Sequence, residues 1–168
     1  MRGTLRPAPV RTATGADAEA LYALSAPFIR SGALRPRTVA DYRRPGERFL
    51  VVPGAGPGGG PDGGLDGCVA LRALPAEPGH PAAGLLHNFC VREGRQGAGL
   101  GSRLLAALLA EAARCGLRTL VTASTGDGAL FLRGGFREIP VALAPRGWAA
   151  GLDPSRGSRV FALALAEG

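Results

Sequence analysis

Hydrophobic residues along the chain follow two spacings, one typical of helices and one typical of strands. The clearest helical spacing follows residue 99, where leucines recur three or four positions apart and Gly116 is placed to end the helix. Shorter helices are predicted from Asp17 to about Ser25, near Thr38–Tyr42 and over Asp127–Gly134. The apolar positions of the long helix are Leu100, Leu104, Leu105, Leu108 and Ala112.

Short apolar runs bounded by Gly or Pro predict the strands. These runs lie at residues 9–12, 48–52, 68–72, 85–91, 119–122 and 159–165. With one further strand before the last, the order of elements is β-α-α-β-β-β-α-β-α-β-β. This order predicts an α+β or α/β fold with a mixed sheet and one long central helix.

A stretch of low complexity separates two of the predicted strands. Residues 53–67 consist mostly of Gly, Pro, Ala and Asp, a composition typical of a flexible linker. We expect a mobile Gly/Pro-rich loop that joins neighbouring strands and has no function of its own. No internal repeat is present, and residues 1–168 are expected to form one domain.

Composition narrows the class of protein. The chain is 46% hydrophobic and 20% charged, as in globular proteins. It has no secretory signal, and no apolar run approaches the ~18 residues of a membrane span. Its three cysteines are too few and too scattered for a disulfide framework or a metal site, and its two histidines lie far apart. We therefore expect a cytoplasmic protein without a metal and without a membrane partner.

The net charge of +7 raises the question of nucleic-acid binding. All 20 basic residues are arginines, which is typical of a GC-rich coding bias, and they are spread along the chain. Few aromatic residues are present to stack on bases. An anionic small-molecule substrate explains the charge equally well, so no nucleic-acid partner is expected.

The segment Arg92–Ser102 joins a strand to the long helix and is rich in glycine. A glycine-rich loop that leads into a helix N-terminus is suited to bind a phosphate group, because backbone N–H groups and the helix dipole both favour an anion. A P-loop is excluded because the chain has no Lys. A dinucleotide-binding fingerprint would require the first strand-helix-strand unit and a later acidic residue, and neither condition is met.

The residues Arg95–Gly101 resemble the [Q/R]-x-x-G-x-[G/A] signature of the GNAT superfamily of N-acetyltransferases, and Phe131–Phe136 looks like its F-Y-x-x-x-G-F element. The resemblance implies the GNAT fold, with six to seven strands splayed between the fourth and fifth and about four flanking helices. It implies acetyl-CoA as co-substrate, with the pyrophosphate on backbone N–H groups and the pantetheine arm along the fourth strand. Homodimers are common in the superfamily, so the resemblance is compatible with a homodimer. The implied cofactor-binding residues are Phe89, Cys90, Val91, Arg95, Gln96, Gly97, Ala98, Gly99, Leu100, Gly101, Ser102 and Phe131.

Within the superfamily, the chain is most similar to short N-acetylglutamate synthases that lack an amino-acid-kinase domain. Residues 32–38 are similar to that family's G-I-L-x-x-R-[ST] stretch, 124–136 to its S-T-x-x-G-x-x-F…G-F run, and 143–161 to its tail with R-x-S. The family uses the early Arg and the R-x-S pair for substrate carboxylates, and an Arg guanidinium matches a carboxylate as a two-pronged donor. The implied acceptor is the α-amino group of an amino acid such as L-glutamate, a step that opens arginine biosynthesis. The substrate-binding candidates are Arg37, Asn88, Arg156 and Ser158.

The catalytic residues of many superfamily members are replaced in this chain. A Glu at the start of the polar strand is replaced by Leu85, and strict alternation would place His87 on the same face, together with Phe89 and Val91. The pKa of a His near 6.5 suits a general base, so His87 is the candidate, with a packing role as the alternative. Asn88 and Cys90 would then face the other way, and Cys90 is interpreted as packing.

The tyrosine that protonates the leaving thiolate in many members is replaced by Leu132. Ser124 or Thr125 is therefore the candidate proton or hydrogen-bond donor. Two other functions stay open: acetylation of another carboxylate-bearing amine in specialised metabolism, and a non-catalytic acyl-CoA-binding module.

Overall fold

The computed structural model describes residues 9–54 and 64–165. Seven strands form one sheet in the order β1-β2-β3-β4-β5-β7-β6, and only the β4–β5 pair is parallel. This is the mixed sheet that the order of elements predicted. The strands are β1 (Arg11–Thr12), β2 (Arg48–Pro53), β3 (Leu65–Leu74), β4 (Ala83–Val91), β5 (Thr119–Ser124), β6 (Arg137–Ile139) and β7 (Arg159–Ala164).

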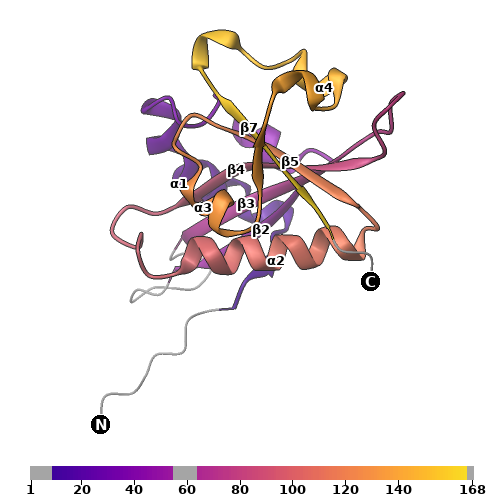
Figure 1. Cartoon of the computed structure of the whole chain (residues 1–168). Helices are drawn as coiled ribbons and strands as arrows, with labels where there is room; N and C mark the ends of the chain where they lie inside the picture. Colours follow the sequence, from indigo (N-terminus) through magenta and orange to yellow (C-terminus); the bar gives the residue numbers. More distant parts are fainter. Residues whose placement is uncertain (1–8, 55–63, 166–168) are drawn as a thin grey trace.

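Helices cover both faces of the sheet (Figure 1). Alternate residues of β2 show the two layers: Leu50 and Val52 pack in the core beneath α2, whereas Val51 packs in the core beneath α1. The α-helices are α1 (Ala18–Arg30), α2 (Leu100–Arg114), α3 (Ala129–Arg133) and α4 (Arg146–Ala149), and the 3₁₀ turns are η1 (Gly15–Asp17), η2 (Val39–Arg43), η3 (Val141–Leu143) and η4 (Pro154–Arg156). None of the helices in the described ranges is long and apolar enough to cross a membrane.

Several boundaries differ from the predicted ones. The first helix continues past Ser25 to Arg30, with Pro27 inside it, because its apolar face is buried against the sheet along its length. The short helix predicted near Thr38–Tyr42 is present as the 3₁₀ helix η2 (Val39–Arg43), with Thr38 as its N-cap. Residues 65–67 of the expected loop are the start of β3, while residues 55–63, its centre, lie outside the described residues.

The parallel strands β4 and β5 separate soon after they meet. Their ladder consists of Gly84 with Leu120 and Leu85 with Val121, although β4 continues to Val91. At the point of separation, the Thr122 hydroxyl donates a 2.8 Å hydrogen bond to the carbonyl oxygen of Leu86. The predicted splay between the fourth and fifth strands is thus confirmed, and beyond it β4 pairs with β3 alone.

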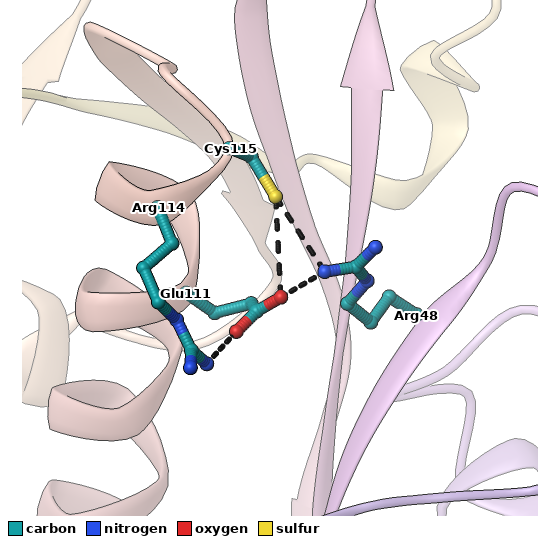
Figure 2. A network of polar contacts seen from close by, with 4 residues as sticks. All are labelled: Arg48, Glu111, Arg114 and Cys115. Carbon is teal, nitrogen blue, oxygen red and sulfur yellow. Dashed lines mark hydrogen bonds and ion pairs between the residues drawn. The ribbon is translucent and has the colours of Figure 1, made fainter.

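A buried carboxylate ties the end of α2 to the sheet (Figure 2). The Glu111 side chain is 6% exposed and forms ion pairs with Arg48 of β2 and with Arg114 one turn along its own helix. The thiol of Cys115 lies 3.6 Å from Nη1 of Arg48 and 3.9 Å from the carboxylate. Because the side chains of Arg48 and Arg114 are 49% and 74% exposed, water can solvate them when the carboxylate is removed.

We therefore expect Glu111→Ala to lower the free energy of unfolding by about 1–2 kcal/mol, the value of two hydrogen bonds to charged groups less the solvation regained. Glu138→Ala is the matched control, because Glu138 also pairs with an arginine but is 52% exposed. Its loss should cost under about 0.5 kcal/mol. Urea unfolding of both variants measures the loss in free energy of unfolding. Equal losses would show that the burial of Glu111 adds no stability.

Candidate active site

A β-bulge in β4 sets the direction of the polar side chains in this strand. Ala70 of β3 pairs with His87 and Cys68 pairs with Cys90, so one residue of β3 stands opposite two residues of β4. The bulge is centred on Asn88, whose φ of 47° lies in the left-handed region. Asn adopts this conformation more readily than most other residues.

The bulge overturns the predicted alternation along β4. His87, Asn88 and Cys90 all contact the layer of α1, whereas Phe89 and Val91 pack in the core beneath α2. The expectation that His87 shares a face with Phe89 and Val91 was wrong, because two consecutive residues at the bulge point to the same side. The expectation that Cys90 faces away from His87 fails for the same reason.

A cavity of about 630 Å³ lies where β4 and β5 separate. It brings together nine of the residues that the sequence singled out, although they come from five separate segments of the chain. These residues are Arg37, His87, Asn88, Phe89, Ser124, Thr125, Phe131, Arg156 and Ser158. Such a concave site with a few convergent polar groups is typical of a small-molecule site.

The lining of the cavity is strongly basic. Arg35, Arg37, Arg72 and Arg156 all reach it, and among the described residues that line it none is acidic. Arg35 and Arg72 were not among the predicted site residues. Arg72 carries no local signal of its own, since it lies at an exposed position near the end of an ordinary apolar strand and reaches the cavity through the pairing of β3 with β4.

Two of these arginines also join the loops at the cavity mouth. Nη2 of Arg156 donates to the carbonyl oxygens of Gly32 at 2.9 Å and Ala33 at 3.3 Å. Nη2 of Arg35 donates to the carbonyl oxygen of Gly151 at 2.9 Å. The segment after α1 and the segment before β7 are thereby held together, and each guanidinium keeps further N–H donors.

Polar groups from β5 and β4 complete the cavity. The Ser124 hydroxyl accepts a hydrogen bond from the Gly126 amide at 3.1 Å, which leaves its own O–H free to donate. The Asn88 side chain is buried and donates to Ser25 Oγ at 3.1 Å. Asn88 therefore borders the cavity with an amide that is already committed to α1.

His87 has a neighbour at each ring nitrogen. Nη2 of Arg37 lies 2.7 Å from Nδ1, and a carboxylate oxygen of Glu47 lies 2.8 Å from Nε2. In this arrangement no ring nitrogen has a lone pair that faces the cavity. Glu47 was not predicted as a site residue, because a single Glu before a strand gives no sequence signal.

The glycine-rich loop has the geometry of an anion site. Gly94, Gly97 and Gly99 have φ values of 84°, 83° and 81°, and a Cβ at any of them would meet no atom within 4 Å. Gly99 is the N-cap of α2 and provides no side-chain hydrogen bond, and the first turn of α2 has no acidic residue. The first N–H groups of a helix have no acceptor within it, so those of Leu100, Gly101 and Ser102 are available to a ligand.

The side chains of this loop fix its position on β3 and β4. The guanidinium of Arg95 lies 3.1 Å from the buried carboxylate of Asp66, and Arg92 donates to the carbonyl oxygen of Leu65 at 2.9 Å. Gln96 donates to the carbonyl oxygen of Val91 at 3.1 Å. Of the predicted cofactor-binding residues, Cys90, Val91 and those from Arg95 to Ser102 lie outside the cavity lining.

Aromatic rings pack together at one wall of the cavity. Phe131 packs edge-on against Phe89, with ring centroids 6.0 Å apart, and also contacts Phe136 and Phe161. Two of the predicted cofactor-binding residues, Phe89 and Phe131, thus touch each other at the cavity wall. In the part of the chain that the structure describes, no three His, Cys, Asp or Glu side chains gather as metal ligands would.

Residues 46–138, more than half of the chain, match the family described as acetyltransferase (GNAT) domain. The chain therefore belongs to the GNAT acetyltransferases, and the fold and acyltransferase class follow from this membership. No curated protein sequence matches the chain significantly.

Solved structures support the fold at low sequence identity. N-acetylglutamate synthase from Neisseria gonorrhoeae, complexed with coenzyme A and N-acetyl-glutamate, superposes with a TM-score of 0.76 at 23% identity over 96% of this chain. This chain spans 36% of the length of that synthase. Rv2747 from Mycobacterium tuberculosis, in complex with CoA, gives 0.73 at 19% identity, covering 94% of this chain and 99% of its own. The GNAT family acetyltransferase YhbS from Escherichia coli, also in complex with CoA, gives 0.63 at 20% identity, covering 99% and 86%.

Proposed function

We propose that this chain transfers an acetyl group from acetyl-CoA to the α-amino group of an amino acid, with L-glutamate as the first candidate acceptor. The observation that carries the proposal is the basic cavity at the splay of β4 and β5, which four arginines line and which has room for an amino acid beside the thioester. Each carboxylate of a dicarboxylic amino acid can accept paired hydrogen bonds from a guanidinium.

The co-substrate fits the elements beside the cavity. The pyrophosphate of CoA would be bound by the N–H groups from Gln96 to Ser102 at the start of α2. The pantetheine arm would lie along residues 89–91, where β4 has no partner on the side of β5. The thioester would then reach the cavity beside Phe89 and Phe131. Three of the structural neighbours described above contain CoA, and one also contains N-acetyl-glutamate, which supports this assignment.

The reaction is a direct attack in a ternary complex. The neutral amine nitrogen forms a bond to the thioester carbonyl carbon, the C–S bond breaks, and the CoA thiolate takes up a proton as the nitrogen loses one. The hydroxyl of Ser124 or Thr125 would donate to the leaving sulfur, and the free O–H of Ser124 suits this role. Arg37, Arg156 and Ser158 would hold the carboxylates and orient the amine.

The test is CoA release from acetyl-CoA with L-glutamate and a panel of other amino acids. The matched control acceptor is a monoamine of similar length without carboxylates. Turnover with glutamate and none with the monoamine is the expected result. Turnover with only another amine would support the acetyltransferase activity but assign a different acceptor. If no amine of the panel led to CoA release while acetyl-CoA bound at a stoichiometry of one, the result would favour an acyl-CoA-binding module.

A further inference from the structure

A buried carboxylate behind the cavity has no role in the chemistry described so far. Glu47 lies immediately before β2, and its side chain is 8% exposed. One oxygen lies 2.8 Å from Nε2 of His87 and the other lies 3.7 Å from Nη1 of Arg72. This 2.8 Å contact is a close approach without the angles of a regular hydrogen bond, and neither Nε2 of His87 nor the facing oxygen of Glu47 has a hydrogen-bond partner elsewhere among the described residues. The imidazole and the carboxylate are therefore each other's close polar neighbours.

The contact at the other ring nitrogen defines the tautomer of His87. A guanidinium has only donors, so Nδ1 must accept the 2.7 Å hydrogen bond from Arg37 with its lone pair. In a neutral imidazole the proton then lies on Nε2, where the Glu47 carboxylate faces it. Phe49 packs edge-on against the ring, with centroids 6.4 Å apart, and holds its plane.

The charges of the surrounding groups agree with this protonation state. Burial lowers the pKa of His87 below its usual value, and the positive charges of Arg37 and Arg72 lower it further. The Glu47 carboxylate raises the pKa, but by less than the other contributions lower it. Burial by itself would raise the pKa of Glu47, but the contacts with His87, Arg37 and Arg72 outweigh it and lower the pKa. At neutral pH the group is thus an ionised Glu47, a neutral His87 and a cationic Arg37.

Arg37 is fixed from two directions by this arrangement. Its Nη2 is bound to His87, and its guanidinium lies 5.9 Å from the centre of the Tyr42 ring. Because Arg37 also lines the cavity, the guanidinium N–H groups that His87 does not use are available to a substrate carboxylate there. A preorganised guanidinium binds a carboxylate more tightly than a freely rotating one, since less side-chain entropy is lost on binding.

We propose that Glu47 and His87 are positioning residues that hold Arg37 as a receptor for the substrate carboxylate, and that His87 is not the general base. The inference deepens the proposed function and rests on it for the identity of the carboxylate. The relay runs from Glu47 through His87 to Arg37, and no proton of the reaction passes through the imidazole.

Kinetics of two His87 variants separate positioning from base catalysis. In His87→Asn, Oδ1 takes the place of Nδ1 and can still accept from Arg37, but the amide cannot act as a base. We expect the acceptor KM to rise about tenfold or more in His87→Ala and to stay within about fivefold in His87→Asn, with kcat within about threefold in both. A base would instead lose about 100-fold in kcat in both variants.

The pH profile gives a second distinction. Protonation of His87 removes the acceptor for Arg37, and burial lowers the pKa of His87 below its ordinary value. The acceptor amine titrates in the same way with every variant, so the wild type is compared with His87→Asn at each pH. The ratio of their acceptor KM values should be constant down to about pH 6.5 and change only at more acid pH, where the KM of the wild type rises. The charged groups that face His87 are Glu47, Arg37 and Arg72. If the kcat of the wild type fell with acid relative to that of His87→Asn while the KM ratio stayed constant, His87 would be the base and the proposal would be overturned.

A readout without any acceptor distinguishes failure of the relay from failure of the proposed function. Nitrogen-15 NMR of histidine-labelled protein reports which ring nitrogen carries the proton, and His80→Gln removes the signals of the other histidine. We expect an unprotonated Nδ1 and a protonated Nε2 in the wild type and in Glu47→Gln. In Glu47→Ala we expect mixed tautomers, because the ring that Glu47 no longer holds also loses its contact with Arg37. A proton on Nδ1 in the wild type contradicts the relay even if no acceptor amine is found.

Discussion

Gly99→Val is expected to weaken CoA binding by about 100-fold, equivalent to ~2.7 kcal/mol. Gly99 is the N-cap of α2 and has a φ of 81°, a conformation that a β-branched residue adopts at a cost of about 1–2 kcal/mol. No atom lies within 4 Å of a Cβ built there, so the free protein has room for the side chain. In the complex the same space is where we place the pyrophosphate, and the valine would exclude it from the helix N-terminus.

The matched control is Gly79→Val in the turn between β3 and β4. Gly79 has a φ of 84° and equally open surroundings, but it lies away from the loop. Both variants should lose similar stability in thermal unfolding, and the control should bind CoA like the wild type in calorimetry. If Gly99→Val bound CoA within about threefold of Gly79→Val, the pyrophosphate would not lie on this loop.

Charge removal at Arg156 is expected to raise the KM for the acceptor amino acid by about tenfold or more, with little change in the affinity for CoA. Arg156→Gln removes the charge and the paired geometry, and its amide, which is two bonds shorter than the guanidinium, reaches less far toward the carbonyl oxygens of Gly32 and Ala33. The rise in KM reports the lost carboxylate contact where thermal unfolding and CoA affinity of the variant are those of the wild type.

Arg30→Gln is the control for Arg156→Gln, because Arg30 is exposed at the end of α1 and does not line the cavity. Steady-state kinetics with the acceptor found by CoA release would compare the two variants. An unchanged KM in Arg156→Gln would remove this arginine from the substrate site and leave it as a brace between the loops. A rise of the same size in the control would indicate a general effect of surface charge.

Local sequence patterns predicted the elements whose conformation depends mainly on short-range interactions. The leucine spacing from Leu100 predicted α2, and residue types alone predicted an anion site in the glycine-rich loop before it. Both depend on short-range physics: side chains one turn apart share a helix face, and glycines adopt positive φ without a steric penalty. The resemblance to the GNAT superfamily added the number of strands and the splay between β4 and β5, which the structure confirms.

The bulge at Asn88 was beyond local prediction. Strict alternation follows from the geometry of a regular strand, but β4 contains an extra residue whose φ is 47°. Such a residue is stabilised by its partners, here Ser25 on α1 and Cys68 on β3, which are distant in the sequence. The prediction that His87 shares a face with Phe89 therefore failed at the position where tertiary contacts override the period of the strand.

By itself, the sequence predicted the kind of fold, a glycine-rich loop suited to bind an anion and most of the polar residues that meet in the cavity. Only the tertiary structure showed that Arg35 and Arg72 join Arg37 and Arg156 there, and that Glu47 lies behind His87. The physical reason is that hydrophobic periodicity encodes burial within one element, whereas the partners of a charged side chain are set by strand register and loop packing. A single arginine or glutamate has the same appearance in the sequence whether water or another buried side chain surrounds it.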